Sequence, residues 1–116
     1  MSLIKTEITG KVFKITLNRP EKFNSFIREM ALEMQDALDK AASDKSVRCV
    51  YITGEGKAFH AGQDLSEAID PVGPGLKRIV EEHYNPIIRK IRSLEKPVVC
   101  AVNGVAAGAG LAFDGG

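Results

Sequence analysis

The sequence predicts an α/β fold, in which strands and helices alternate within one layered domain. Three observations support this prediction. Short segments with strand-like apolar patterns alternate with longer segments of helical periodicity. The run from Val47 to Thr53 is almost continuously apolar, as in a parallel strand covered on both faces. A length of 116 residues, of which 44% are hydrophobic, suits one domain of ordinary globular composition.

The first two strands are expected to form a hairpin with one apolar face. Apolar and polar residues alternate in the segment 4–8 and again in 13–17, and Gly10-Lys11 lies between them. Pro20 ends this pattern because it has no N–H to donate and restricts the residue before it.

An amphipathic helix is predicted next. Asn24 or Ser25 is expected to cap its start, with Glu29 near the positive end of the helix dipole. The segment 43–46 should close it. Its apolar face is expected to contain Ile27, Met30, Met34, Ala37, Leu38 and Ala41.

The middle of the chain contains the buried strand 47–53 and a turn over 54–57. A short extended piece at Ala58-Phe59 follows, and the segment 61–65 is expected to enter a short helix.

The last third begins with a loop at 71–75, rich in proline and glycine. A long amphipathic helix over 76–94 follows, in which Pro86 should cause a kink or a break. The strand 98–102 comes next, and Asn103-Gly104 opens a turn that should lead into a further helix.

Composition excludes several classes of function. Sixteen Lys and Arg against fifteen Asp and Glu leave a net charge of +1, so no basic surface for nucleic acid or membrane is expected. No apolar run approaches the roughly 18 residues of a membrane span, and the N-terminus does not resemble an export signal. The cytoplasm is therefore the expected location.

The cysteine and histidine residues predict no metal site, because neither occurs at metal-ligand spacing. Cys49 and Cys100 both lie in strand-like apolar runs, and we interpret them as buried free thiols. A disulfide between them and a catalytic role for one of them remain the alternatives.

Two junctions between a strand and a glycine-rich turn are the candidate functional segments. They span residues 59–65 and 103–110, and each places small residues where a helix should begin. Backbone N–H groups at such a helix start attract negative charge, and two side by side would make an oxyanion hole. Close packing of helix on strand explains Gly108-Ala109-Gly110 equally well. A dinucleotide fingerprint does not fit, because Phe113 stands where the third glycine would be.

Several motifs occur together in a fixed order over nearly the whole chain. They are Leu17-Asn18-Arg19-Pro20, Asn24-Ser25-Phe26, the segment 58–65, and the segment 96–104 with Gly108-Ala109-Gly110. With these motifs the chain resembles the N-terminal part of the enoyl-CoA hydratase/isomerase (crotonase) superfamily. Segments 61–65, 83–89 and 104–110 look most like the subgroup of ring-epoxide isomerases that act on 2-(1,2-epoxy-1,2-dihydrophenyl)acetyl-CoA in phenylacetate catabolism.

The resemblance implies a crotonase-like (ClpP/crotonase) ββα-superhelix, of which residues 1–116 would be the N-terminal part, with the C-terminal half absent. It also implies an acyl-CoA thioester as substrate, no separate cofactor, and a homotrimer or hexamer for the full-length protein. The backbone N–H groups of Gln63 and Ala109 would form the oxyanion hole. The residues implied to contact substrate or CoA are Lys22, Phe23, Ala61, Gly62, Gln63, Asp64, Leu65, Ser66, Gly108 and Ala109.

Two of the neighbouring side chains also have simpler explanations. Asp64 is expected to order its turn more than to transfer a proton, because Asp is a common turn residue. His60 is interpreted as an ordinary residue at a strand end, with a contact in the substrate pocket as the alternative.

The sequence departs from the superfamily pattern near its end. Hydratases that it resembles carry a catalytic Glu two residues after the glycine triplet, where this chain has Ala112, and their second acid or base would lie beyond Gly116. One hypothesis is an acyl-CoA enzyme, an isomerase or hydratase of aromatic or fatty acid catabolism that stabilises a thioester enolate. The other is a truncated or catalytically silent module for CoA binding or oligomerisation. A generic nucleotide-binding α/β domain is a third, weaker interpretation.

Overall fold

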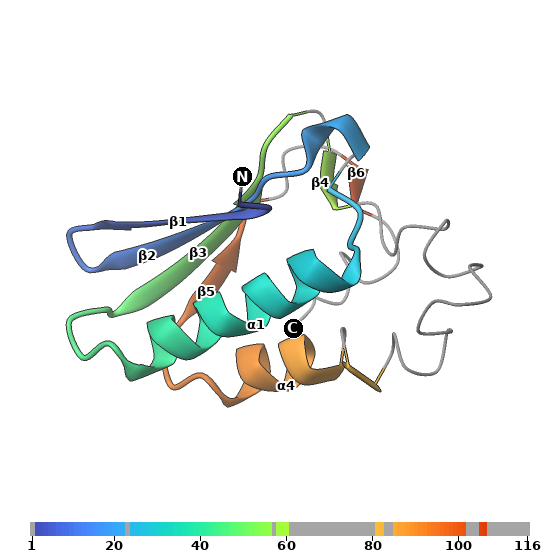
Figure 1. Cartoon of the computed structure of the whole chain (residues 1–116). Helices are drawn as coiled ribbons and strands as arrows, with labels where there is room; N and C mark the ends of the chain where they lie inside the picture. The colour runs from blue at the N-terminus through green and yellow to red at the C-terminus, as the bar shows by residue number, and fades with distance from the viewer. Residues whose placement is uncertain are drawn as a thin grey trace.

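The structure is a computed structural model of the chain that describes residues 2–22, 24–56, 58–60, 81–82, 85–101 and 105–106. Figure 1 shows a twisted sheet with helices beneath one of its faces. The α/β prediction is therefore confirmed. In chain order the elements are β1 (Ile4–Thr9), β2 (Val12–Leu17), the 3₁₀ helix η1 (Pro20–Lys22), α1 (Arg28–Ser43), β3 (Cys49–Gly54), β4 (Ala58–His60), α4 (Asn85–Ser93), β5 (Val98–Cys100) and β6 (Val105–Ala106).

Within the described residues the main sheet has four strands, in the order β1-β2-β3-β5. Strands β1 and β2 form the predicted antiparallel hairpin, with Ile4 opposite Leu17 and Thr9 opposite Val12. Gly10 turns the chain between them with a φ of 61°, a conformation that glycine adopts without steric cost. The pairs β2–β3 and β3–β5 are parallel, as the predicted alternation of strands and helices requires.

Helices α1 and α4 lie side by side under the sheet (Figure 1) and enclose the core with it. The Lys90 ammonium ties the two helices together through an ion pair of 2.7 Å with Asp39. The predicted apolar face of α1 is confirmed except that Ile27 is only half-buried, and Ala31 belongs to the face as well. The buried apolar residues are Ile4, Phe13, Ile15, Leu17, Phe26, Met30, Ala31, Met34, Ala37, Leu38, Ala41, Val47, Val50, Ile52, Ile87 and Ile91.

Two predictions of burial are wrong. Strand β3 buries Val50 and Ile52 in the core but leaves Tyr51 half-buried, so its second face is not fully covered within the described chain. Ile8 is 49% exposed, although the alternation placed it on the apolar face of the hairpin. The reason is visible in Figure 1, where the tip of the hairpin projects beyond the end of α1 and has no helix beneath it.

The first turn of α1 differs from the prediction. The helix begins at Arg28, and its N-cap residue is Ile27, which makes no side-chain capping bond. Neither Asn24 nor Ser25 caps it, because both are already engaged in the turn before the helix. The sequence also did not predict η1, which Pro20 starts with its fixed φ.

The last third of the chain keeps the predicted order with different limits. Pro86 is the second residue of α4, where its missing N–H costs no bond within that helix, and residues 83–84 just before α4 lie outside the described residues, so the kink or break at Pro86 stays a prediction. The predicted segments 61–65 and 71–75 and the first residues of the predicted long helix lie outside the described residues.

Both cysteines are free thiols and half-buried, not fully buried as predicted. A disulfide is excluded by the register of β3 with β5, which sets Cys100 opposite Ile52. Cys49 lies three residues before Ile52 on the same strand, an offset of about 10 Å, and disulfides span about 4.4–6.8 Å between Cα atoms.

The end of α1 is fixed by a lysine from the segment before β5. Lys96 donates from its ammonium to the carbonyl oxygens of Ala41 and Asp44, both at 2.7 Å. The last carbonyls of a helix lack partners within the helix and carry partial negative charge, so this cation is well placed. Asp44 accepts bonds from the hydroxyl and backbone N–H of Ser46, and these bonds lower the pKa of its carboxyl.

Replacing Lys96 with methionine is expected to lower the free energy of unfolding by about 1–2 kcal/mol, because two carbonyls lose a charged donor. Urea denaturation followed by circular dichroism measures this loss. The matched control is Lys45→Met, at an exposed position in the adjacent turn, for which a change within about 0.5 kcal/mol is expected. An equal loss in both variants would contradict the capping role.

Candidate functional site

The two candidate segments are brought together by a second, two-stranded sheet. Strand β4 pairs in parallel with β6, with Ala58 opposite Val105 and His60 opposite Ala106. Figure 1 shows this pair beyond one end of the main sheet. Because parallel strands run in the same direction, the chain leaves both strands at the same edge. The carboxyl ends of such strands are the usual ligand site in α/β proteins.

This pairing was not predicted. Val105 and Ala106 form strand β6 within the segment expected to be a turn, and the helix expected after that turn lies outside the described residues. The strand could not be predicted because two residues give no periodic signal of their own. The consequence for the site is direct: Gln63 follows His60 by three residues, and Ala109 follows Ala106 by the same number.

Most of the predicted site residues lie outside the described residues: Phe23, Ala61, Gly62, Gln63, Asp64, Leu65, Ser66, Gly108 and Ala109. Their roles stay predictions. The described backbone places His60 at the end of β4, as the strand-end interpretation expected. Lys22 is described as well, and it is the last residue of η1 and exposed.

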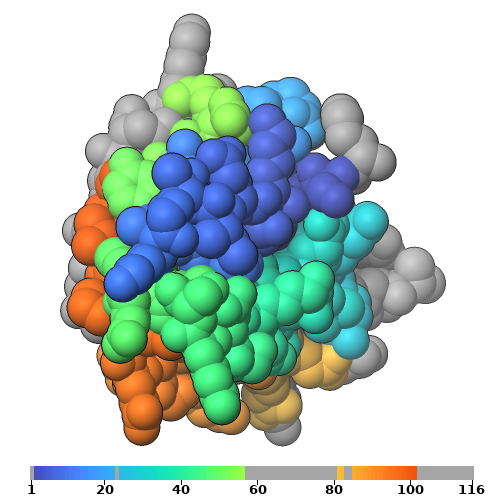
Figure 2. Space-filling model, turned by 90° about the vertical axis from the view of Figure 1, so that its left-hand side faces the viewer, coloured from blue at the N-terminus to red at the C-terminus, as the bar shows by residue number. Residues whose placement is uncertain are grey.

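Helix η1 is held against the turn that leads into β4. A Cβ atom added at Gly56 would lie 2.9 Å from Cβ of Pro20, so these two segments are in close contact and position 56 requires glycine. Asn24 donates from its side-chain nitrogen to the carbonyl oxygen of Glu55 at 2.9 Å. Figure 1 and Figure 2 both show η1 next to the segment that leads into β4. Lys22, the last residue of η1, therefore stands near the turn from which the chain enters β4.

Asn24 is the site-proximal residue that sequence reasoning missed. Its side chain is fully buried, and its φ of 58° lies in the left-handed region. Asparagine tolerates this conformation better than most residues, so it suits a tight turn with a buried amide. The spacing suggested a helix cap because asparagine is common at both places.

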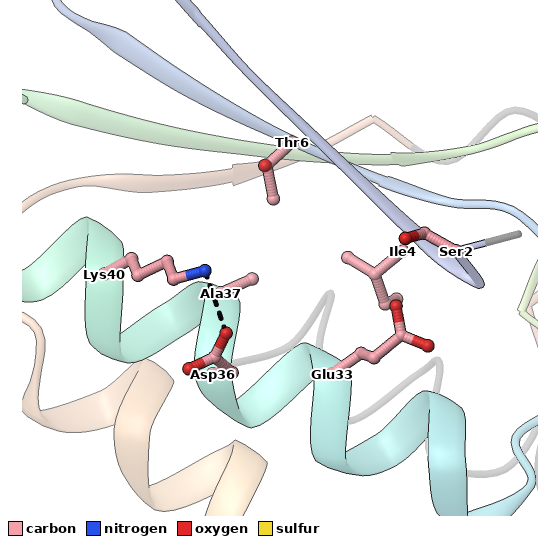
Figure 3. A pocket seen from close by; sticks show the side chains of 7 residues that line it. All are labelled: Ser2, Ile4, Thr6, Glu33, Asp36, Ala37 and Lys40. Atoms are coloured by element: carbon pink, nitrogen blue, oxygen red, sulfur yellow. Dashed lines mark ion pairs between the residues drawn. The ribbon is translucent and has the colours of Figure 1, made fainter.

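A separate pocket of about 230 Å³ lies between β1 and α1 (Figure 3). It is lined by Ser2, Ile4, Thr6, Glu33, Asp36, Ala37 and Lys40. The Lys40 ammonium points to the Asp36 carboxylate at 3.0 Å, and Glu33 accepts a bond of 3.4 Å from the backbone N–H of Leu3. Each of these three charged groups therefore has a partner, and none of the lining residues belongs to β4, β6 or η1.

Two further site types have no support in the described part of the chain. Among those residues no group of His, Cys, Asp or Glu side chains could hold a metal ion. No helix formed by the same residues is long and apolar enough to cross a membrane.

Comparison with known families identifies the class of protein that this fold and this site define. The model of the enoyl-CoA hydratase/isomerase family matches residues 7–114, which is nearly the whole sequence. The chain therefore belongs to the enoyl-CoA hydratase/isomerase family. The resemblance inferred from the sequence motifs is confirmed.

Individual relatives refine this assignment. The chain is 47% identical to the 1,2-epoxyphenylacetyl-CoA isomerase of Escherichia coli over 113 residues, which cover 95% of this chain and 43% of the relative. It is 38% identical to 4-chlorobenzoyl coenzyme A dehalogenase-2 of Arthrobacter over 116 residues, covering 96% of this chain and 41% of that one. The names of both relatives refer to coenzyme A, while the named reactions differ.

A solved structure confirms the fold. The crystal structure of an enoyl-CoA hydratase from Mycobacterium avium subsp. paratuberculosis superposes with a TM-score of 0.85 at 32% identity, covering 98% of this chain and 44% of that one. The chain thus has the fold of the N-terminal portion of a crotonase. It spans 41–43% of the length of the two curated relatives described above.

Proposed function

We propose that this chain carries the thioester-binding part of an acyl-CoA enzyme that stabilises an enolate through two backbone N–H groups. The observation that carries the proposal is the parallel pairing of β4 with β6, which end level at His60 and Ala106. Gln63 and Ala109 follow these paired residues at equal distance in sequence. Membership of the enoyl-CoA hydratase/isomerase family supports the same chemistry.

Formation of an enolate requires groups that stabilise negative charge on the thioester oxygen. When a proton leaves the carbon next to a thioester carbonyl, charge develops on the carbonyl oxygen. Two N–H donors already aimed at that oxygen stabilise the transition state without reorganisation, and each donor is worth about 3–4 kcal/mol. We assign the donors to Gln63 and Ala109. Ala61, Gly62, Asp64, Leu65, Ser66 and Gly108 would line the acyl and pantetheine path, and Lys22 with Phe23 would meet the nucleotide end of CoA.

The proton itself needs a base, which typically contributes about 10²–10⁴ in rate. Ala112, at the position discussed above, cannot serve as one. We therefore expect the catalytic base to be a residue other than those assigned above to the oxyanion hole and to CoA binding. We further propose isomerisation of a ring epoxide as the reaction, because the relative at 47% identity is named for a substrate of that kind. No separate cofactor is needed for this reaction. The expected homotrimer or hexamer and the cytoplasmic location remain predictions.

Titration calorimetry with acetoacetyl-CoA tests the proposal, because the enolate form of this ligand mimics the charged intermediate. The experiment uses the full-length protein that the gene encodes. We expect acetoacetyl-CoA to bind at least about tenfold more tightly than free CoA, since only the thioester presents an oxygen to the two donors. ATP is the control for a generic nucleotide site.

Equal affinity for acetoacetyl-CoA and ATP, or no binding of the thioester, would overturn the proposal. Thioester binding without turnover of either an enoyl-CoA or a ring-epoxide substrate would favour the silent binding module instead.

A further inference from the structure

Asn24 joins two turns that lie next to the proposed site. Its side-chain oxygen accepts a bond of 2.7 Å from the backbone N–H of Arg19, and its side-chain nitrogen donates to the carbonyl oxygen of Glu55 at 2.9 Å. Its own backbone N–H donates to the carbonyl oxygen of Arg19 at 2.8 Å. One fully buried amide therefore closes the loop around η1 and attaches that loop to a different part of the chain.

The attachment point is itself fixed to the main sheet. The backbone N–H of Glu55 donates to the carbonyl oxygen of Leu17 at 2.8 Å, which extends the pairing of β2 with β3 by one bond. The same turn continues into β4. Through Asn24, the η1 loop is therefore held in a fixed position relative to the main sheet and to the turn before β4.

The loop that Asn24 closes carries Lys22. The backbone N–H of Lys22 donates to the carbonyl oxygen of Arg19 at 3.1 Å, so the lysine is part of the closed turn. Its exposed side chain is long and rotatable, and its reach depends on where the turn is held. A displacement of the turn by about 1 Å would weaken a charge-assisted bond from this ammonium to a phosphate.

The buried amide and the backbone conformation of Asn24 both distinguish it from an ordinary turn residue. A buried amide must have its partners, because an unpaired one carries the full cost of its desolvation. Its left-handed backbone conformation is disfavoured for residues other than glycine, asparagine and aspartate. A glycine at this position would adopt the same backbone conformation without strain, but it would make neither the side-chain bond to Arg19 nor the one to Glu55.

We propose that Asn24 is a positioning residue of the acyl-CoA site: its buried amide fixes η1 against the turn before β4 and thereby places the Lys22 ammonium at the phosphates of CoA. This inference rests on the proposed function. Asn24 acts through Lys22 and does not touch the acyl group.

A double-mutant cycle tests the inference, with Asn24→Gly and Lys22→Gln alone and combined. Calorimetry measures the dissociation constants of acetoacetyl-CoA and of acetoacetyl-pantetheine, which lacks the nucleotide and its phosphates. We expect each single variant to weaken acetoacetyl-CoA binding about tenfold. The combined variant should bind no more weakly than Lys22→Gln alone, and acetoacetyl-pantetheine should bind equally to all four proteins.

Two controls separate positioning from loss of structure. Asn18→Gly makes the same exchange in the strand-end turn just before η1, where the side chain donates to the carbonyl oxygen of Ser2 at 3.1 Å, and it should leave the affinity unchanged. Asn24→Asp keeps the acceptor for Arg19 but places a carboxylate oxygen against the carbonyl of Glu55. It should weaken acetoacetyl-CoA binding in the same direction, so the test remains available if the glycine variant does not fold.

The outcomes distinguish this inference from the proposed function. If the unmodified protein binds no thioester, both fall. If it binds and Lys22→Gln weakens binding while both Asn24 variants do not, only the positioning role is wrong. Additive effects of Asn24→Gly and Lys22→Gln, or an equal loss for acetoacetyl-pantetheine, would also overturn it, because a general structural defect behaves in that way.

Discussion

Replacing Gln63 with proline is expected to lower kcat by about 10²–10³-fold, the usual cost of losing one donor of an oxyanion hole. Proline removes the backbone N–H, which is the group that the proposed mechanism uses. Replacing the same residue with alanine keeps that N–H and should change kcat by less than about threefold. Steady-state kinetics on an acyl-CoA substrate measures both effects, and circular dichroism verifies that each variant is folded.

Comparing kcat of the two variants shows whether the backbone N–H or the side chain of Gln63 acts on the substrate. A large loss in Gln63→Ala would show that the side chain, not the backbone, acts on the substrate. A normal kcat in Gln63→Pro would remove Gln63 from the oxyanion hole.

Replacing Phe26 with alanine is expected to lower the free energy of unfolding by about 3–5 kcal/mol. Phe26 has no exposed surface and is among the largest fully buried side chains of the described core. It lies between η1 and the start of α1, so the cavity left behind would loosen the junction between the turn and the helix layer. Urea denaturation monitored by circular dichroism measures the loss.

Leu32→Ala is the matched control for this core substitution. Leu32 belongs to α1 but is 44% exposed, so a loss of no more than about 1 kcal/mol is expected. A similar loss in the two variants would contradict the burial pattern of the helix.

The elements with repeated patterns could be predicted from the sequence. The apolar pattern repeats several times in each hairpin strand and in α1. A single residue whose burial departs from that pattern, such as Ile8, therefore does not change the assignment of the element. Strand β3 was found because its apolar run is long enough to be distinct. The family was inferred from motifs in a fixed order and is confirmed.

The parts that could not be predicted depend on contacts between distant segments. Strand β6 has only two residues, and its existence follows from the presence of β4 rather than from its own sequence. Asn24 was interpreted as a helix cap, because its bond to Glu55 crosses to a turn thirty-one positions further along the chain. The half-buried second face of β3 likewise reflects which segments lie over the sheet, and a strand pattern does not contain that information.

The β4–β6 pair also has a consequence for how the protein folds. The N-terminal hairpin needs only neighbouring residues, so it can form early at little cost in loop entropy. The β4–β6 pair joins residues separated by the whole α4 segment and β5. Closing so long a loop gains nothing until the contacts at its ends are made. Strand β5 pairs with β3 across a loop of similar length, so we expect the proposed site to form together with that pairing and after the N-terminal hairpin.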